Sequence, residues 1–207
     1  MENASVFVLA GGRSSRMGSD KALLPIGHRN LLQLTLDKAR QLALQPVVVG
    51  SRSRYDQYGE VIEDVIPGCG PLGGIHAALN ATQTDLNLIL SVDMPLLTTD
   101  FLRWLLQLAS ANCALAIVPE AEGRFQPLCS VYRRAAQPEV ERALRMRDYK
   151  VDRLFSLLPT RFIPQSEWLA AGFPPDIFRN VNTPEEYKAV ARMSEDIPRS
   201  SSTGLQS

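Results

Sequence analysis

The sequence has few of the residues on which several classes of enzyme and small domain depend. Its 207 residues include two histidines, His28 and His76, and no GxSxG motif, so there is little basis for a Ser-His hydrolase. We interpret His28 as a loop residue and His76 as a residue on a helix face. The three cysteines, Cys69, Cys113 and Cys129, are too widely spaced for a zinc site and odd in number for a disulfide framework. We expect them to be reduced and structural.

Charge of neither sign predominates, because Lys and Arg together number 22 and so do Asp and Glu. A formal net charge of zero provides no global basic field, so we expect neither nucleic acid nor a membrane surface as a partner. The sequence also lacks an apolar run long enough to cross a membrane and a basic start typical of a signal peptide. These absences lead us to expect a cytoplasmic protein.

What is present is an ordinary globular composition, with 45% hydrophobic and 21% charged residues. A chain of this length is sufficient for one domain with a core of its own. We expect that domain to cover residues 1–193. We expect the polar segment 194–207 to be a disordered tail.

An apolar strand predicted at Val6 to Leu9 continues directly into glycines and basic residues, in the sequence LAGGRSSRMGSDK at 9–21. Glycine lets main-chain amides approach phosphate oxygens, and the cations Arg13, Arg16 and Lys21 offset phosphate charge. The pattern predicts a nucleotide phosphate loop. The alternative is a surface turn with solvated basic residues, but the carboxyl end of a first strand is where open α/β sheets bind ligands.

Two common phosphate loops do not fit this stretch. A P-loop requires Gly-Lys followed by Ser or Thr, whereas Lys21 lies between Asp20 and Ala22. A dinucleotide-binding loop requires glycines spaced G-x-G-x-x-G, and here they fall at 11, 12 and 18. The stretch PVVVG at 46–50, which contains the second predicted strand, also ends without an acidic residue. The loop is therefore of another kind.

Strand-like and helix-like segments alternate along the chain, as in βαβ units with a mostly parallel sheet. The segment Pro127 to Tyr132 predicts a returning strand, so we expect one antiparallel strand in that sheet. Predicted strands are 47–49, 61–66, 86–92, 113–118, 127–132 and an edge strand at 160–163. Predicted helices are 31–44 capped by Asn30, 75–81, 100–109 capped by Thr98 or Thr99, 138–144, 151–158 and one that begins at the Thr183 cap.

Two further features lie between these elements. Residues 67–74 form a second glycine-rich stretch, which we interpret as a turn before the helix at Ile75; an ordinary tight connection is the alternative. Asp93 follows the apolar strand 86–92 directly. A carboxylate there is costly unless it is exposed or has a partner, which favours a functional role for Asp93 over a plain loop or capping role.

A cationic glycine loop and one strand-end carboxylate are suited to phosphoryl or nucleotidyl transfer. In attack on a nucleotide α-phosphate, the protein aligns and neutralises anionic groups, and magnesium assists. Asp93 would hold Mg²⁺ against the phosphates. Lys21 and Arg16 would neutralise charge on the bridging and leaving oxygens.

The motifs resemble those of a known family. LAGGRSSRMGSDKALLPIG at 9–27 is similar to the signature loop of nucleotidyltransferases that modify molybdopterin, within the nucleotide-diphosphate-sugar pyrophosphorylase superfamily. The similarity continues with VIED at 61–64, GPLGG at 70–74, SVDMPLL at 91–97, QPLCSVY at 126–132 and NVNTPEEY at 180–187. RMGxxK alone marks only the superfamily. The combination resembles the molybdenum cofactor guanylyltransferases over nearly the whole chain except the tail.

The resemblance implies a single-domain, three-layer α/β/α Rossmann-like nucleotidyltransferase fold. It also implies transfer of GMP from GTP to molybdenum-molybdopterin, with Mg²⁺ as cofactor and pyrophosphate as the second product. Asp93 matches the residue that contacts both GTP and Mg²⁺, and Asn180 and Asn182 would lie near the pterin. The nucleotide-binding positions that it implies are Leu9, Ala10, Gly11, Gly12, Lys21, Asp64 and Asp93. Asp64 as a solvated strand-end carboxylate, and the two asparagines as turn-forming residues, are the alternatives.

Other functions remain open at this point. Cytidylyl relatives tend to read LAAG where this chain reads LAGG at 9–12, which favours guanine over a molybdopterin cytidylyltransferase. A sugar-phosphate nucleotidyltransferase and a nucleotide-binding module without catalysis are further alternatives. The chain departs from the family at Gly50, where some members have a nucleotide-contacting asparagine. By resemblance we also expect transient contacts with other molybdenum cofactor proteins.

Overall fold

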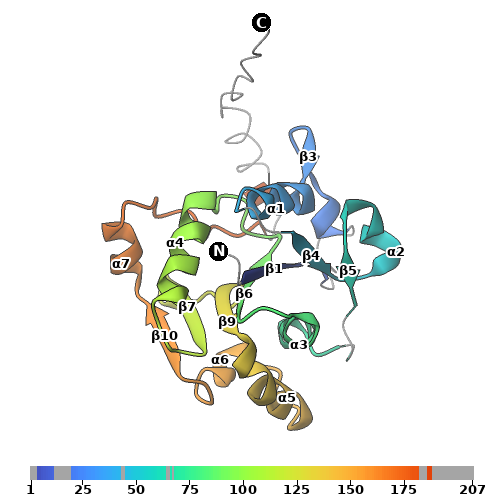
Figure 1. Cartoon of the computed structure of the whole chain (residues 1–207). Coiled ribbons are helices and arrows are strands. Elements are labelled where there is room, and N and C mark those ends of the chain that lie inside the picture. Colours follow the sequence, from blue (N-terminus) through green and yellow to red (C-terminus); the bar gives the residue numbers. More distant parts are fainter. Residues whose placement is uncertain are drawn as a thin grey trace, which may run out of the picture.

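One sheet with helices on both faces forms the described part of the protein (Figure 1). The computed structural model describes residues 4–11, 20–42, 45–63, 66, 68–181 and 186–187. Within them, eight strands form the sheet in the order β10-β7-β9-β6-β1-β4-β5, with β8 paired to β7, while β2 and β3 form a separate hairpin. No helix in these residues is long and apolar enough to span a bilayer.

The strands are β1 (Ala4–Leu9), β2 (Pro25–Ile26), β3 (Arg29–Asn30), β4 (Pro46–Val49), β5 (Val61–Ile62), β6 (Leu86–Ser91), β7 (Ala116–Ala121), β8 (Arg124–Phe125), β9 (Cys129–Arg133) and β10 (Thr160–Ile163). The α-helices are α1 (Leu31–Arg40), α2 (Arg52–Tyr55), α3 (Pro71–Ala81), α4 (Thr99–Ser110), α5 (Gln137–Arg145), α6 (Val151–Leu154) and α7 (Gln165–Ala170). Short 3₁₀ helices are η1 (Lys21–Leu23), η2 (Asp56–Tyr58) and η3 (Arg134–Ala136).

The strand directions confirm the predicted mostly parallel sheet with an antiparallel strand. Strand β1 pairs in parallel with β4 and β6, and β10 pairs in parallel with β7. Strand β9 runs antiparallel to both of its neighbours, β6 and β7. The predicted edge strand at 160–163 is β10, which lies at one end of the sheet order.

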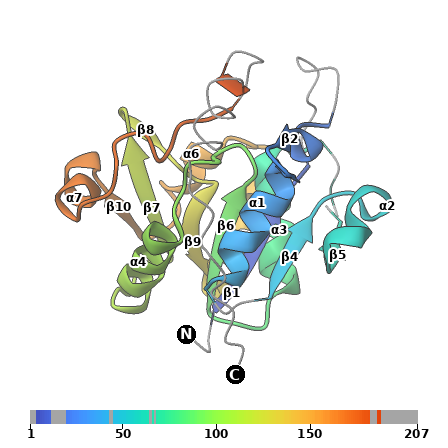
Figure 2. The ribbon, with the colours of Figure 1, turned by 90° about the horizontal axis from the view of Figure 1, so that it is seen from above.

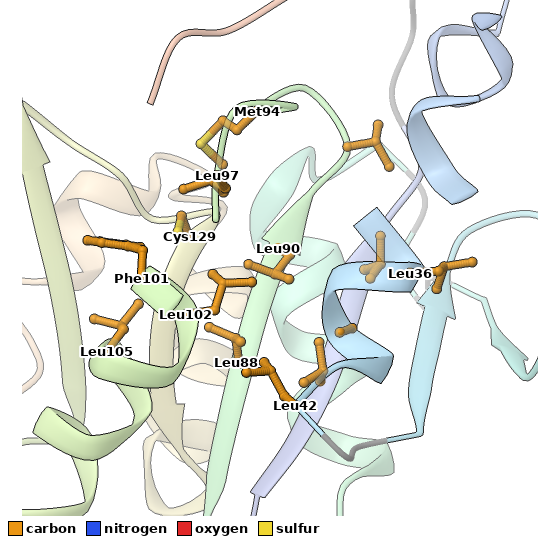
Figure 3. Close-up of a cluster of buried hydrophobic side chains, with 14 of the residues drawn as sticks. Leu36, Leu42, Leu88, Leu90, Met94, Leu97, Phe101, Leu102, Leu105 and Cys129 are labelled. Carbon is orange, nitrogen blue, oxygen red and sulfur yellow. The ribbon is translucent and has the colours of Figure 1, made fainter. Parts of the chain in front are cut away.

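Alternation of apolar side chains divides the core into two halves, one on each face of the sheet. Val6 and Val8 of β1 point to the face covered by α1, α4 and α7, whereas Phe7 and Leu9 point to the face covered by α3, α5 and α6. Figure 3 shows the first half, where leucines of α1 and α4 meet Leu88 and Leu90 of β6. Because the central strands bury side chains on both faces, they form the middle layer of three.

Several boundaries differ from those predicted. The second glycine-rich stretch is not wholly a turn, because α3 begins at Pro71 and the glycines of GPLGG after it are helical. Proline is favoured in the first turn of a helix, where its missing N–H costs nothing. Strand β5 ends at Ile62 rather than at Ile66, and α6 ends at Leu154 rather than at Leu158. The helix predicted from the Thr183 cap lies mostly outside the described residues.

Candidate functional site

The site lies where the chain changes direction across the sheet. From β1 the chain passes through α1 to β4 and β5, and it then returns through α3 to β6 on the other side of β1. Ligands of open α/β sheets bind at such a switch point, outside the carboxyl ends of the strands. Leu9 and Ser91 are register partners in β1 and β6, so these parallel strands end at the same edge of the sheet. Figure 2 shows α1 packed in front of these central strands.

Lys21 and Asp93 meet at this edge. Lys21 Nζ lies 3.5 Å from Asp93 Oδ2, at the long end of a hydrogen bond, and the side chains are 18% and 27% exposed. The residues are 72 positions apart in the sequence. The structure therefore brings together the two charged groups for which the sequence analysis predicted a role. Both side chains remain accessible to solvent.

The chain after β6 is held in place by buried side chains as well as by polar contacts. Met94 and Leu97 are each 4% exposed and pack into the core beside Cys129 (Figure 3). Ser91 Oγ donates a hydrogen bond to Asp93 Oδ1. The carboxylate is thus oriented by its own loop, with Oδ1 held by serine and Oδ2 facing the lysine.

Lys38 of α1 contacts the same loop, which follows β6 and contains Asp93. Its ammonium group donates a hydrogen bond to the main-chain carbonyl of Pro95. Burial lowers the pKa of Lys38 to about 8, and electrostatic attraction to the ionised form of Cys129 acts in the opposite direction. A buried ammonium group is costly unless it has a partner, so this contact is a specific restraint on the segment that follows Asp93.

The segment that precedes the last helix also reaches Asp93. The Val181 amide donates a hydrogen bond of 2.8 Å to the Asp93 main-chain carbonyl. Asn180, which is half-buried, is the residue immediately before Val181. The structure therefore places Asn180 next to the chain around Asp93, whereas its predicted place near the pterin stays a prediction.

The strand end that precedes the predicted phosphate loop is also ordered by main-chain contacts. Leu9 is buried and its side chain packs under α3, so only its main chain faces the site. The Ala10 amide donates a 3.0 Å hydrogen bond to Val49 O, and Gly11 is exposed at the point where the chain leaves β1. The remaining predicted site residues, Gly12, Arg16, Asp64 and Asn182, lie outside the described residues.

Sequence reasoning missed a contact between Tyr55, Asp20 and the end of β1. The Tyr55 hydroxyl lies 2.8 Å from Asp20 Oδ2 and 3.0 Å from the Ala10 carbonyl oxygen, and Arg54 Nη1 lies 3.4 Å from Asp20 Oδ2. Burial, and then the Asp20 carboxylate, raise the pKa of Tyr55 well above its usual range. The sequence shows Arg54 and Tyr55 only as part of a polar connector, without a signal for this role.

Among the described residues the two histidines make none of these contacts, whereas Cys129 packs beside Met94 and Leu97 and lies near Lys38. His28 lies in the turn between β2 and β3, and His76 is buried on α3, where its ring contacts Asn80. Both predictions for the histidines are confirmed. The three cysteines all lie in the described part of the chain and are free, as predicted. Cys69 and Cys129 are buried as structural residues would be, whereas Cys113 is exposed.

Comparison with solved structures defines the class as that of the nucleotidyltransferase fold. The molybdopterin-guanine dinucleotide biosynthesis protein A from Archaeoglobus fulgidus matches with a TM-score of 0.82 and 25% identity, over 92% of this chain and 98% of that one. The 2-C-methyl-D-erythritol 4-phosphate cytidylyltransferase from Thermus thermophilus shares the fold, with a TM-score of 0.66 and 19% identity, over 92% and 98% of the two chains.

Sequence comparison defines the family. The model of the MobA-like NTP transferase domain matches residues 6–161. A probable molybdenum cofactor guanylyltransferase from Carboxydothermus hydrogenoformans is 32% identical over 195 residues, which are 93% of this chain and 98% of that protein. The molybdenum cofactor guanylyltransferase of Vibrio cholerae is 30% identical over 188 residues, 89% of each. The chain belongs to the MobA-like NTP transferase family.

Proposed function

We propose that this protein transfers GMP from GTP to molybdenum-molybdopterin, forming the guanine dinucleotide form of the cofactor and pyrophosphate. The observation that carries the proposal is the pair Lys21–Asp93 at the switch point of the sheet, in a chain that matches guanylyltransferases over nearly its full length. The reaction requires charge neutralisation and alignment, and it requires no nucleophilic side chain.

GTP would bind at the carboxyl edge of β1. Leu9, Ala10 and Gly11 offer main chain at the point where the strand ends, with little side-chain bulk on its exposed side. Lys21 would exchange its long contact with Asp93 for a phosphate oxygen, since a triphosphate carries more charge than one carboxylate. Roles for Gly12, Arg16 and Asp64 in binding the nucleotide stay predictions from sequence.

The donor set at Asp93 fits a magnesium ion. Mg²⁺ prefers oxygen ligands, and it is commonly held by one or two carboxylates together with substrate phosphates and water. Asp93 supplies such a carboxylate at an accessible position. Among the described residues no group of three or more acidic, histidine or cysteine side chains could hold a metal ion, so the other ligands would be substrate phosphates and water. Bound there, Mg²⁺ would stabilise negative charge on the triphosphate.

The acceptor would approach from the side of Asn180. That residue is joined to the chain at Asp93 through the Val181 amide, so the two substrates would meet next to the same carboxylate. Asn182 stays a prediction on this side of the site. We place the reaction in the cytoplasm and expect the product to pass to other molybdenum cofactor proteins.

The decisive experiment measures pyrophosphate release by the purified protein with Mg²⁺. GTP, CTP and ATP are each supplied with molybdenum-molybdopterin, and GTP is also supplied with common sugar phosphates as acceptors. We expect release with GTP and molybdenum-molybdopterin only. Equal or faster release with CTP would support the cytidylyltransferase, release with a sugar phosphate would support that class, and tight GTP binding without turnover would support a binding module.

A further inference from the structure

The contacts of Tyr55 join two chain segments that both lead into the nucleotide site. One segment is the end of β1, where Ala10 precedes Gly11, and the other begins at Asp20, which precedes Lys21. The tyrosine hydroxyl lies 3.0 Å from the Ala10 carbonyl oxygen and 2.8 Å from Asp20 Oδ2. Because both partners are hydrogen-bond acceptors, the tyrosine hydroxyl donates its single hydrogen to both of them in a bifurcated hydrogen bond.

The two oxygens of Asp20 have different partners. Oδ1 accepts a 3.1 Å hydrogen bond from the Ala22 amide and caps η1, the short helix that begins with Lys21. Oδ2 accepts from Tyr55 and lies 3.4 Å from Arg54 Nη1. One carboxylate therefore fixes the direction of η1 through Oδ1 and its distance from β1 through Oδ2.

The ring of Tyr55 is held as firmly as its hydroxyl. The residue is 2% exposed and lies in the core next to Gly50. A Cβ atom at Gly50 would lie 2.8 Å from Tyr55 Cε2 and 3.0 Å from Cδ2, closer than side-chain atoms pack. Glycine at position 50 thus leaves the space that the ring requires.

From these contacts we propose that Tyr55 is a positioning residue, which fixes the spacing between the end of β1 and Lys21 and thereby prepares the triphosphate site. The proposal rests on the proposed GTP site. Tyr55 acts through Ala10 and Asp20 and does not itself take part in the chemistry. Its restraint is made before the nucleotide arrives, so it contributes to binding more than to the chemical step.

The first test compares Tyr55→Phe with Tyr58→Phe. Tyr58 is on the adjacent η2, and its hydroxyl accepts a 2.9 Å hydrogen bond from Asn30 rather than contacting Ala10 or Asp20. Tyr55→Phe keeps the ring and removes the shared donor. We expect the Kd and KM for Mg²⁺–GTP to rise about tenfold with kcat changed less than about threefold, since one charge-assisted contact is lost. Tyr58→Phe should leave these values unchanged.

Amide hydrogen exchange of the free protein tests the restraint without any substrate. The amides of Ala22, Leu23 and Leu24 are hydrogen-bonded within the turn that begins at Asp20. Tyr55→Phe should accelerate their exchange, whereas Tyr58→Phe should not. Unchanged exchange in Tyr55→Phe would overturn the proposal, and so would accelerated exchange with an unchanged Kd in a protein that binds GTP.

Two more variants, at Asp20 and Gly50, test whether the effect on GTP binding depends on the contact between Tyr55 and Asp20 and on the position of the ring. Asp20→Ser keeps a residue able to cap η1 but is too short to reach Tyr55, so combining it with Tyr55→Phe should raise the Kd no further than the larger single change. Additive effects would overturn the shared contact. Gly50→Ala should displace the ring and weaken GTP binding while the hydroxyl is retained. Normal binding by Gly50→Ala would contradict the role of the ring.

The wild-type protein separates this inference from the proposed function. If wild-type protein binds GTP and Tyr55→Phe binds it equally well, the positioning role fails and the GTP site stands. If wild-type protein binds no GTP, the proposed function fails, and the exchange rates of Ala22, Leu23 and Leu24 alone decide whether Tyr55 restrains η1.

Discussion

At the scale of single residues, Asp93 is the group whose removal should separate catalysis from folding. Its side chain is 27% exposed and its main-chain carbonyl, which accepts from Val181, is unaffected by substitution. Asp93→Asn should lower kcat by about 100-fold or more, because an amide binds a divalent cation far more weakly than a carboxylate does. The assay is Mg²⁺-dependent pyrophosphate release at saturating GTP.

The control for Asp93→Asn is Asp100→Asn, on the first turn of α4. Asp100 is largely exposed and pairs only at the surface with Arg103, so its loss should leave kcat unchanged. Both variants should unfold in urea at nearly the wild-type midpoint. Near-normal turnover by Asp93→Asn would remove Asp93 from the mechanism.

Lys38 should make the stability of the protein depend on pH. Burial lowers its pKa to about 8 in the folded protein from the ordinary 10.5, so between these values the unfolded chain binds a proton that the folded protein lacks. Stability linked to Lys38 therefore rises with pH across this window, by about 1 kcal/mol per pH unit near its middle.

The measurement for Lys38 is urea unfolding between pH 7.5 and 9.5, with wild-type protein compared with Lys38→Met. The free-energy difference between the two proteins should change with pH in the stated direction. Lys150→Met, at an exposed position, should follow the wild-type curve. Parallel curves for wild type and Lys38→Met would show that the lysine titrates normally.

At the scale of elements, α3 packs closely on β1 because Gly74 has no side chain. A Cβ atom at Gly74 would lie 2.7 Å from Leu9 Cδ2 and 3.0 Å from Leu9 Cγ. Gly74→Ala gains about 1 kcal/mol of helix propensity but loses about 1–3 kcal/mol by overpacking. We expect a net loss of stability together with weaker GTP binding, because Leu9 is the last residue of the strand that leads into the site.

A double-mutant cycle tests this contact between α3 and β1. Leu9→Ala removes the atoms that the new methyl group would meet, so the double variant should be more stable than the sum of the two single effects predicts. Urea unfolding of all four proteins gives the coupling energy. Strict additivity would mean that the helix moves away from the strand instead of pressing on Leu9.

The elements that the sequence predicted well carry local signals. Asn30 forms a capping box with Gln33 at the start of α1, and Thr98 caps α4, as expected. The predicted end of β5 and the predicted start of α3 were wrong. The length of β5 is set by its pairing with β4, and α3 includes glycines whose sequence pattern indicated a turn. Tyr55 and Asp20 could not be paired from sequence, since nothing local marks two polar residues 35 positions apart as neighbours.

At the scale of the whole molecule, the alternation of elements predicted a mostly parallel α/β sheet, and the resemblance implied three layers. The order of the strands in the sheet could not be predicted from this alternation, because a hydrophobic pattern does not indicate which strands are neighbours. The position of β1 between β4 and β6 is what makes Lys21 and Asp93 a pair. The sequence analysis predicted a role for each residue, and the topology places their charged groups 3.5 Å apart.

Binding of GTP at a site that spans two central strands should stabilise the whole domain. At about 100 times its Kd, a ligand that binds only the folded state adds about 2.7 kcal/mol, which for a protein of this size raises the Tm by roughly 5–10 °C. Thermal unfolding with Mg²⁺ and each nucleotide checks this. GTP should give a larger shift than CTP at equal concentration, and equal shifts would argue against selection of guanine.

The pairing of β1 with β6 also has a consequence for how the chain folds. It joins Ala4 to Leu86 across α1, β4, β5 and α3, so it closes one of the long loops of the topology. Closing such a loop costs chain entropy that local helices do not require, and contacts of this kind slow folding. Because Lys21 and Asp93 belong to opposite sides of this closure, we expect refolding protein to regain GTP binding only after most of its helical signal has returned.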